Sequence, residues 1–167
     1  MDAIVYTSNT GTTEAYAKLL SDKTGLPAYA LKDAAGHVAP GAKIIYMGWL
    51  MASSVKGYKK AAKTYQVSAV CGVGMAKTGT QIPEVRKANA LPDAFPVFVL
   101  QGGFDMKKLR GIYKFMMGVV SKSMIKGLSE KADKTPEEAD MLDMALHGGN
   151  RVSAENLAAV LTWYGKQ

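Results

Sequence analysis

Short apolar runs alternate with segments of helical periodicity over most of the chain. The apolar runs predict β-strands at residues 2–7, 27–31, 42–48, 67–73 and 95–101. The helical segments predict α-helices at residues 11–24, 52–65, 80–90 and 153–165. Strands that alternate with helices are joined by crossover connections, so the pattern predicts an α/β fold whose five-stranded parallel sheet carries helices on both faces. The second connection, residues 32–40, is short and should hold only a turn or two of helix.

A hydroxyl-rich turn follows the first predicted strand and opens the first predicted helix. Its residues are Ser8, Asn9, Thr10, Gly11, Thr12 and Thr13. Backbone amides and the positive end of the helix dipole meet at such a helix N-terminus, and the hydroxyls add uncharged donors. The glycine patterns of the Walker loop and of dinucleotide-binding folds are absent from the sequence. We therefore expect this loop to hold one terminal phosphate; an ordinary helix-capping segment is the alternative.

At this turn the chain resembles the flavodoxin family, whose phosphate loop reads [ST]-x-T-G-x-T between the first strand and the first helix. The matching residues are Ser8, Thr10, Gly11 and Thr13. The resemblance implies that the loop wraps the phosphate of FMN and that the doubly wound sheet has the strand order 2-1-3-4-5. It covers about residues 2–105 and 150–166. In such sheets the ligand lies beyond the carboxyl ends of the strands at the switch point, so the loops after strands one, three and four form the candidate site.

The loops after the third and fourth strands have the chemistry to enclose a flavin ring. They contain Trp49, Leu50, Met51 and Ala52 in the first loop, and Val73, Gly74, Met75 and Ala76 in the second. An indole and flexible apolar side chains can cover a planar ring, while glycines let the backbone approach its edge. The resemblance implies that these loops sandwich the isoalloxazine ring of FMN. The alternatives are a core or subunit-contact role for Trp49 and plain turn chemistry for the glycines.

The charge of the chain departs from that of an ordinary flavodoxin electron carrier. Lysine and arginine number 21 against 14 aspartates and glutamates, a net charge of +7, whereas such carriers are strongly acidic. The two ring-loop segments contain Lys56 and Lys77 but no carboxylate. Because a nearby cation favours the negatively charged reduced flavin, we expect a less reducing flavin and a two-electron acceptor rather than a low-potential carrier.

A helical insert, about residues 106–147, separates the fifth strand from the last helix. Its first part, residues 107–126, carries six cations and no acid: Lys107, Lys108, Arg110, Lys114, Lys122 and Lys126. On a helical wheel the cations occupy one half. The other half holds Leu109, Ile112, Tyr113, Met116, Met117, Val119, Val120 and Met124, with Phe115 and Ile125 as exceptions. Three glycines, Gly111, Gly118 and Gly127, predict that the helix breaks into two pieces.

The basic insert predicts a partner surface. A basic amphipathic helix rich in methionine suits an anionic amphiphilic substrate, a membrane surface or an acidic partner. The residues proposed to meet it are Arg110, Lys114, Lys122 and Lys126. The alternative is a helix that packs on the sheet and leaves its basic face to solvent. Despite the positive charge, no recognised nucleic-acid motif is present, and we expect no nucleic-acid binding.

A glycine-rich end to the fifth strand, followed by this basic insert, is similar to the menaquinone-dependent protoporphyrinogen oxidases of the flavodoxin superfamily. The resemblance implies an FMN-dependent oxidoreductase that oxidises a flat macrocycle bearing two carboxylates and passes electrons to a quinone. It is less specific than the phosphate-loop match. The alternatives are a flavodoxin-type electron carrier to a partner protein and an FMN-independent interaction module. The pattern identifies no catalytic residue.

The remaining features complete a single domain spanning residues 1–167. Thr135, Pro136 and Glu138 predict the N-cap, first residue and capping-box partner of a helix that stops at His147. His147 is expected to be a solvated residue of that last turn rather than a proton donor. Cys71, the single cysteine, lies in an apolar run and predicts a buried thiol. Two histidines and one cysteine show no ligand spacing, so no metal site is expected.

We also expect a cytoplasmic protein. No apolar stretch approaches the ~20 residues of a membrane helix, and the N-terminus lacks the basic and apolar regions of a secretory signal. Any membrane association would therefore occur through the basic insert.

Overall fold

The computed structural model has an α/β fold and describes residues 1–104 and 111–167, apart from the side chains at positions 112, 113, 116, 117 and 120. Its sheet has five main strands, β1 (Ala3–Thr7), β2 (Ala28–Ala30), β3 (Lys43–Met51), β5 (Gln66–Gly74) and β6 (Val97–Gln101). All neighbouring pairs among them are parallel, and they lie in the order β2-β1-β3-β5-β6. The predicted parallel sheet of five strands flanked by helices is confirmed.

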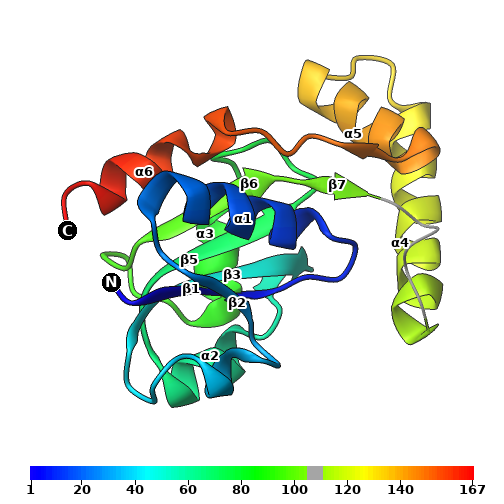
Figure 1. The fold of residues 1–167 in the computed structure, drawn as a ribbon. Coiled ribbons are helices and arrows are strands. Elements are labelled where there is room, and N and C mark those ends of the chain that lie inside the picture. The colour runs from blue at the N-terminus through cyan, green and yellow to red at the C-terminus, as the bar shows by residue number, and fades with distance from the viewer. Residues whose placement is uncertain (105–110) are drawn as a thin grey trace.

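Helices cover both faces of the sheet (Figure 1). On one face lie α1 (Thr12–Thr24) and α6 (Ala158–Tyr164), which follows a short 3-10 turn at Glu155–Leu157. On the other face lie α2 (Tyr58–Thr64) and α3 (Ile82–Asn89). The connection after β2 holds only a 3-10 turn at Ala34–Gly36, as its length predicts.

Alternate side chains of the central strands pack into two separate cores. Ile4 and Ile45 pack with α1 and α6, whereas Val5 and Tyr46 pack with α2 and α3. Because both faces are buried, these strands appear in the sequence as continuous apolar runs. Cys71 is free and fully buried, and this burial raises the pKa of its thiol to about 12.

The second helix begins later than the sequence predicts. Residues 52–65 are expected to be helical, but β3 continues to Met51 and turns back at Ala52 and Ser53. The returning segment forms β4 (Ser54–Val55), which pairs antiparallel with β3, and α2 starts only at Tyr58. Tertiary contacts of the turn thus override its helical periodicity.

The insert contains two long helices that stand beyond the carboxyl ends of the strands (Figure 1). They are α4 (Gly111–Glu130) and α5 (Pro136–His147). Because α4 is one continuous helix, the predicted break is wrong; the two helices pack against each other, and such packing offsets the low helix propensity of glycine. The short strands β7 (Gly103–Phe104) and β8 (Gly149–Asn150) pair antiparallel before and after this helical unit.

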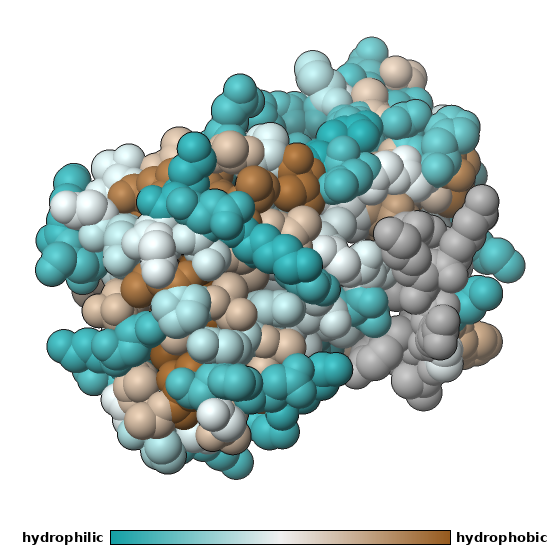
Figure 2. All heavy atoms as spheres, in the orientation of Figure 1, coloured by the Kyte–Doolittle hydropathy of each residue, from teal (hydrophilic) through white to brown (hydrophobic). Residues whose placement is uncertain are grey.

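The start of α5 agrees with its sequence signature. The Thr135 hydroxyl accepts the Glu138 N–H at 3.2 Å, and the Glu138 carboxylate accepts the Thr135 N–H at 2.9 Å. Pro136 is the first helical residue. The region where Figure 1 places α5 is mainly hydrophilic in Figure 2.

Among the residues that the structure describes, no helix is long and apolar enough to cross a membrane.

Candidate functional site

The loop after β1 runs directly into α1 and leaves the start of that helix open. Gly11 is the N-cap and has a φ of 97°, a left-handed conformation that glycine adopts without strain. Its N–H donates to the Ser8 Oγ at 3.1 Å, so the Ser8 hydroxyl closes the turn. In the described ranges no side chain caps α1, and its first-turn amides have no partner within the helix. These amides are available to an anion.

Thr13 carries a buried hydroxyl for which the described residues supply no hydrogen-bond partner. The residue is 1% exposed. Leaving such a group unpaired costs roughly 1–3 kcal/mol. Native proteins keep few buried hydroxyls without a hydrogen-bond partner. The Thr13 hydroxyl therefore indicates a partner that is not part of the described protein. A phosphate oxygen at the start of α1 would be a suitable acceptor.

Three loops selected from the sequence meet at one cavity of about 300 Å³, which we call the ring cavity. Predicted site residues that line it are Asn9, Thr10, Thr12, Trp49, Leu50, Ala52, Val73, Gly74, Met75 and Ala76. Gly11 lines the adjoining cavity, and Ser8 lies at a third cavity beside β2. Thr13 is buried and lines neither the ring cavity nor the adjoining cavity. Met51, at the end of β3 and paired with Ser54, also lines neither the ring cavity nor the adjoining cavity.

Six residues that the sequence did not single out also line the ring cavity. They are Ser53, Gln81, Gly103, Phe104, Met124 and Met141. The glycine pair at the end of β6 was a usable signal for a close contact at this point of the sheet. A Cβ atom on Gly102 would lie 2.6 Å from Val73 Cγ1. Met124 and Met141 belong to the insert, and no local pattern indicated that α4 and α5 reach the cavity.

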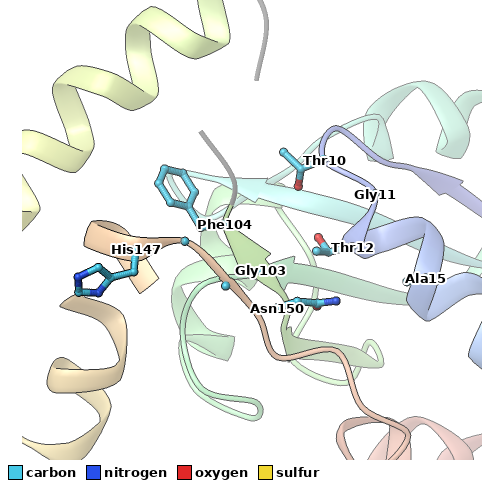
Figure 3. Close-up of a pocket in the computed structure, with 10 residues that line it drawn as sticks. Thr10, Gly11, Thr12, Ala15, Gly103, Phe104, His147 and Asn150 are labelled. Atoms are coloured by element: carbon cyan, nitrogen blue, oxygen red, sulfur yellow. The ribbon is translucent and has the colours of Figure 1, made fainter. Parts of the chain in front are cut away.

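A second cavity of about 490 Å³ adjoins the ring cavity at the start of α1; we call it the loop cavity. The two cavities share Thr10, Thr12, Gly103 and Phe104. Figure 3 shows the threonines and Gly11 on one side and the segment from His147 to Asn150 on the other. The loop after β1 is thus enclosed by the chain that returns from α5.

His147 does not reach toward the hydroxyl-rich loop. In Figure 3 its imidazole points away from Thr10 and Thr12. Its Nδ1 lies 2.9 Å from Asp143 Oδ1, one turn earlier in α5, and its side chain is largely exposed. This geometry agrees with the expectation of a solvated residue in the last helical turn. Across residues 1–104 and 111–167, no group of three or more His, Cys, Asp or Glu side chains could hold a metal ion.

The loop after β3 is held in place from outside the cavity. The Val55 N–H donates to Asn89 Oδ1 at 2.9 Å, and Asn89 Nδ2 donates to the Ser53 carbonyl at 3.0 Å. Asn89 is buried at the end of α3. Its amide therefore stabilises the turn at Ala52 and Ser53, where two non-glycine residues adopt positive φ angles of 46° and 62°.

Trp49 and Leu50 face the ring cavity in different ways. Trp49 is half-buried, and the Lys56 Nζ lies 5.8 Å from its ring centroid, a cation–π distance. Leu50 packs against the backbone of β5, since a Cβ atom on Gly72 would lie 2.8 Å from Leu50 Cδ2 and one on Gly74 would lie 3.1 Å from Leu50 Cδ1. Gly72 and Gly74 therefore make room for the Leu50 side chain. The sequence had suggested that the glycines of this loop make room for the edge of a ligand.

Lys77 points toward the insert and lies outside the ring cavity. Its Nζ lies 2.8 Å from the Glu137 carboxylate at the start of α5. This hydrogen bond and charge raise the pKa of Lys77 and lower the pKa of Glu137. Lys77 is therefore paired with a carboxylate, whereas Lys56 lies over Trp49.

A polar network fastens the insert to the end of the sheet. Gln101 Nε2 donates to Asp140 Oδ2 at 2.7 Å, and the Arg151 guanidinium donates to Asp140 Oδ1 at 2.8 Å. The buried Tyr16 hydroxyl donates to the Gln101 carbonyl and accepts from Asn156 Nδ2 at 2.7 Å. Burial raises the pKa of Tyr16. The network connects α1, β6 and α5 and so determines where α5 lies relative to the ring cavity.

Three of the four cations proposed as a partner surface line neither the ring cavity nor the loop cavity. Lys114, Lys122 and Lys126 are exposed, whereas Met124 of the same helix lines the ring cavity. Arg110 lies outside the described residues. Val119, which the helical wheel places in the apolar half, is 56% exposed.

Comparisons with protein-family models, with curated proteins and with solved structures found no match for this chain. The flavodoxin resemblance therefore stays a prediction, and a functional conclusion must rest on the geometry of the site.

Proposed function

We propose that this chain is a flavodoxin-like protein that binds FMN noncovalently and acts as an FMN-dependent oxidoreductase. One observation carries the proposal: the loops after β1, β3 and β5 line a single cavity beside the open start of α1. With β4 set aside, the order β2-β1-β3-β5-β6 corresponds to the flavodoxin order 2-1-3-4-5. The cavity lies at the switch point, where sheets of this type bind their ligands.

The loop cavity has donors for a phosphate. Thr10, Gly11 and Thr12 line it, and the first-turn amides of α1 supply further N–H groups. The unpaired hydroxyl of Thr13 supports the same assignment, because a charged acceptor would satisfy it. The phosphate of FMN would be bound without a cationic side chain.

The ring cavity has the composition that an isoalloxazine ring requires. Trp49, Leu50 and Met75 supply apolar surface from the sheet loops, while Phe104, Met124 and Met141 supply it from the insert side. Ser53, Asn9 and Gln81 offer polar groups for the ring edge. When bound, FMN would supply the electron-transfer chemistry, and the protein would supply position, exclusion of water and electrostatics.

An oxidoreductase is favoured over an electron carrier because the insert forms part of the wall of the ring cavity. A carrier must present the edge of its ring to a partner protein, whereas here Met124 of α4 and Met141 of α5 line the site. The lining residues include no charged side chain, so the portion of substrate that reaches the ring should be uncharged. The protoporphyrinogen oxidase resemblance implies that the insert cations hold substrate carboxylates. They would do so only if those carboxylates remained outside the ring cavity.

The absorption spectrum of the purified protein, before and after addition of FMN, tests the proposal. We expect saturable binding with a perturbed flavin spectrum and, on titration with dithionite, a single two-electron step. Two separate one-electron steps would support the carrier. A flavin spectrum identical to that of free FMN at all protein concentrations would support the FMN-independent module and overturn the proposal.

A further inference from the structure

We propose that the outer face of α4 docks on an anionic membrane surface, an inference that does not depend on FMN binding. We define the outer face by Phe115, Val119, Lys122 and Lys126, which fall within an arc of about 60° at 100° per residue. Met124 projects about 180° from Phe115 and lines the ring cavity. The helix therefore has one side committed to the cavity and an opposite side directed outward.

The outer face exposes large apolar side chains to water. Phe115 is 74% exposed and Val119 is 56% exposed. Leu146, on the neighbouring helix α5, is 52% exposed. Exposed apolar residues that gather on one element, rather than scatter singly, indicate an interaction surface.

The same face is positively charged and has no described counter-ion. Lys122 and Lys126 are exposed, as is Lys114, about 80° from Lys122 round the helix at 100° per residue. The sequence from Gly111 to Ser129 contains no acidic residue. The ion pairs among described residues that use lysine involve Lys18, Lys77 and Lys131, so none of them neutralises the outer face.

The combination of apolar and basic side chains favours a lipid surface over a protein partner. At an anionic bilayer, lysine ammonium groups contact the headgroup phosphates while apolar side chains enter the acyl boundary between them. A helix of 20 residues is about 30 Å long and can lie along such a surface. In Figure 1, α4 lies at one edge of the molecule.

Vesicle co-sedimentation with the full chain tests the electrostatic part. We expect binding to vesicles of phosphatidylcholine and phosphatidylglycerol, and much weaker binding to phosphatidylcholine alone. Replacing the three α4 lysines (Lys114→Gln, Lys122→Gln, Lys126→Gln) should weaken binding on the order of 100-fold, given about 1 kcal/mol for each lysine near the surface. A matched variant replaces the three exposed lysines of α2 (Lys59→Gln, Lys60→Gln, Lys63→Gln) and should keep most of the binding. Equal losses in both variants would overturn the proposal in favour of a general net-charge effect.

A second variant, Phe115→Ser with Val119→Ser, tests the apolar part. Both side chains are exposed, so the variant should fold, and it should bind anionic vesicles roughly 10-fold more weakly. If its vesicle binding is unchanged while poly-L-glutamate binds through the α4 lysines, the partner is an acidic protein and the membrane proposal fails. FMN titration of the same variants should give the parental affinity. Absence of FMN binding by the parent would overturn the proposed function and leave the vesicle result standing.

Discussion

At the scale of single residues, the Thr13 hydroxyl is a sensitive probe of the phosphate loop. Thr13→Val keeps the shape of the side chain and removes a buried hydroxyl that the protein itself does not satisfy. We expect the free energy of unfolding without FMN to stay the same or rise by about 1 kcal/mol, while FMN affinity falls roughly 10-fold. Thermal unfolding and fluorescence titration measure the two quantities.

Ser121→Ala provides a matched control for that change. Ser121 carries the second buried hydroxyl that lacks a partner among the described residues, but it lies on α4. Its replacement should leave FMN affinity unchanged. If Thr13→Val also leaves FMN affinity unchanged, the Thr13 hydroxyl does not bind phosphate.

Lys56 is the residue expected to adjust the potential of a bound flavin. Its Nζ lies over the Trp49 ring, whereas the charge of Lys77 is opposed by Glu137. Lys56→Gln removes a cation near the ring and should lower the two-electron midpoint by about 20 mV, corresponding to roughly 1 kcal/mol. Lys77→Gln should change it less. Spectroelectrochemistry of both variants decides the order, and a larger effect of Lys77→Gln would contradict the assignment.

At the scale of elements, the hairpin after β3 depends on Asn89. The side chain forms hydrogen bonds to Val55 and Ser53 and is buried. Asn89→Leu leaves a buried N–H and a C=O without their partner, so we expect a loss of about 2–4 kcal/mol in the free energy of unfolding. Trp49 fluorescence, recorded in a Trp163→Phe background, should shift to the red, and FMN affinity should fall. An unshifted spectrum would mean that the hairpin is stable without Asn89.

The ion pair between Lys77 and Glu137 couples α5 to the loop after β5. Lys77→Glu or Glu137→Lys should each speed FMN release only modestly, because solvent screens an exposed ion pair. The double exchange should restore the parental rate. Pairing with Lys77 lowers the pKa of Glu137, so the ion pair is complete at pH values above the ordinary pKa of glutamate. The ion pair is lost as the pH falls through the lowered pKa. Stopped-flow release measured at several pH values tests both statements, and identical rates in all four proteins would contradict them.

Several elements were predictable because their signals are local. The sheet strands are apolar runs buried on both faces, and α5 begins with the capping box of Thr135 and Glu138. The hairpin at residues 51–55 was not predictable, because its positive φ angles fall on Ala52 and Ser53 and are stabilised by Asn89, far along the chain. Similarly, nothing local showed that Met124 and Met141 line the same cavity as Trp49.

At the scale of the whole molecule, an α/β sheet carries a helical insert that closes one end of its candidate site. The body supplies the loops after β1, β3 and β5, and the insert supplies Met124 and Met141. Hydrogen bonds between Gln101, Asp140 and Arg151 keep the two parts together. The outer side of α4 is left for a partner, so the proposed redox site and the proposed membrane surface are separated by the thickness of one helix.

The central claim is that the open start of α1 binds the phosphate of FMN. Comparing FMN with riboflavin, which lacks the phosphate, tests it most directly in the parent and in Thr10→Ala with Thr13→Ala. We expect the parent to bind FMN far more tightly than riboflavin. The double variant should lose on the order of 3–6 kcal/mol of FMN binding, at about 1.5–3 kcal/mol for each hydrogen bond to the charged group, and little of its riboflavin binding. Equal affinities of the parent for FMN and riboflavin would contradict the account.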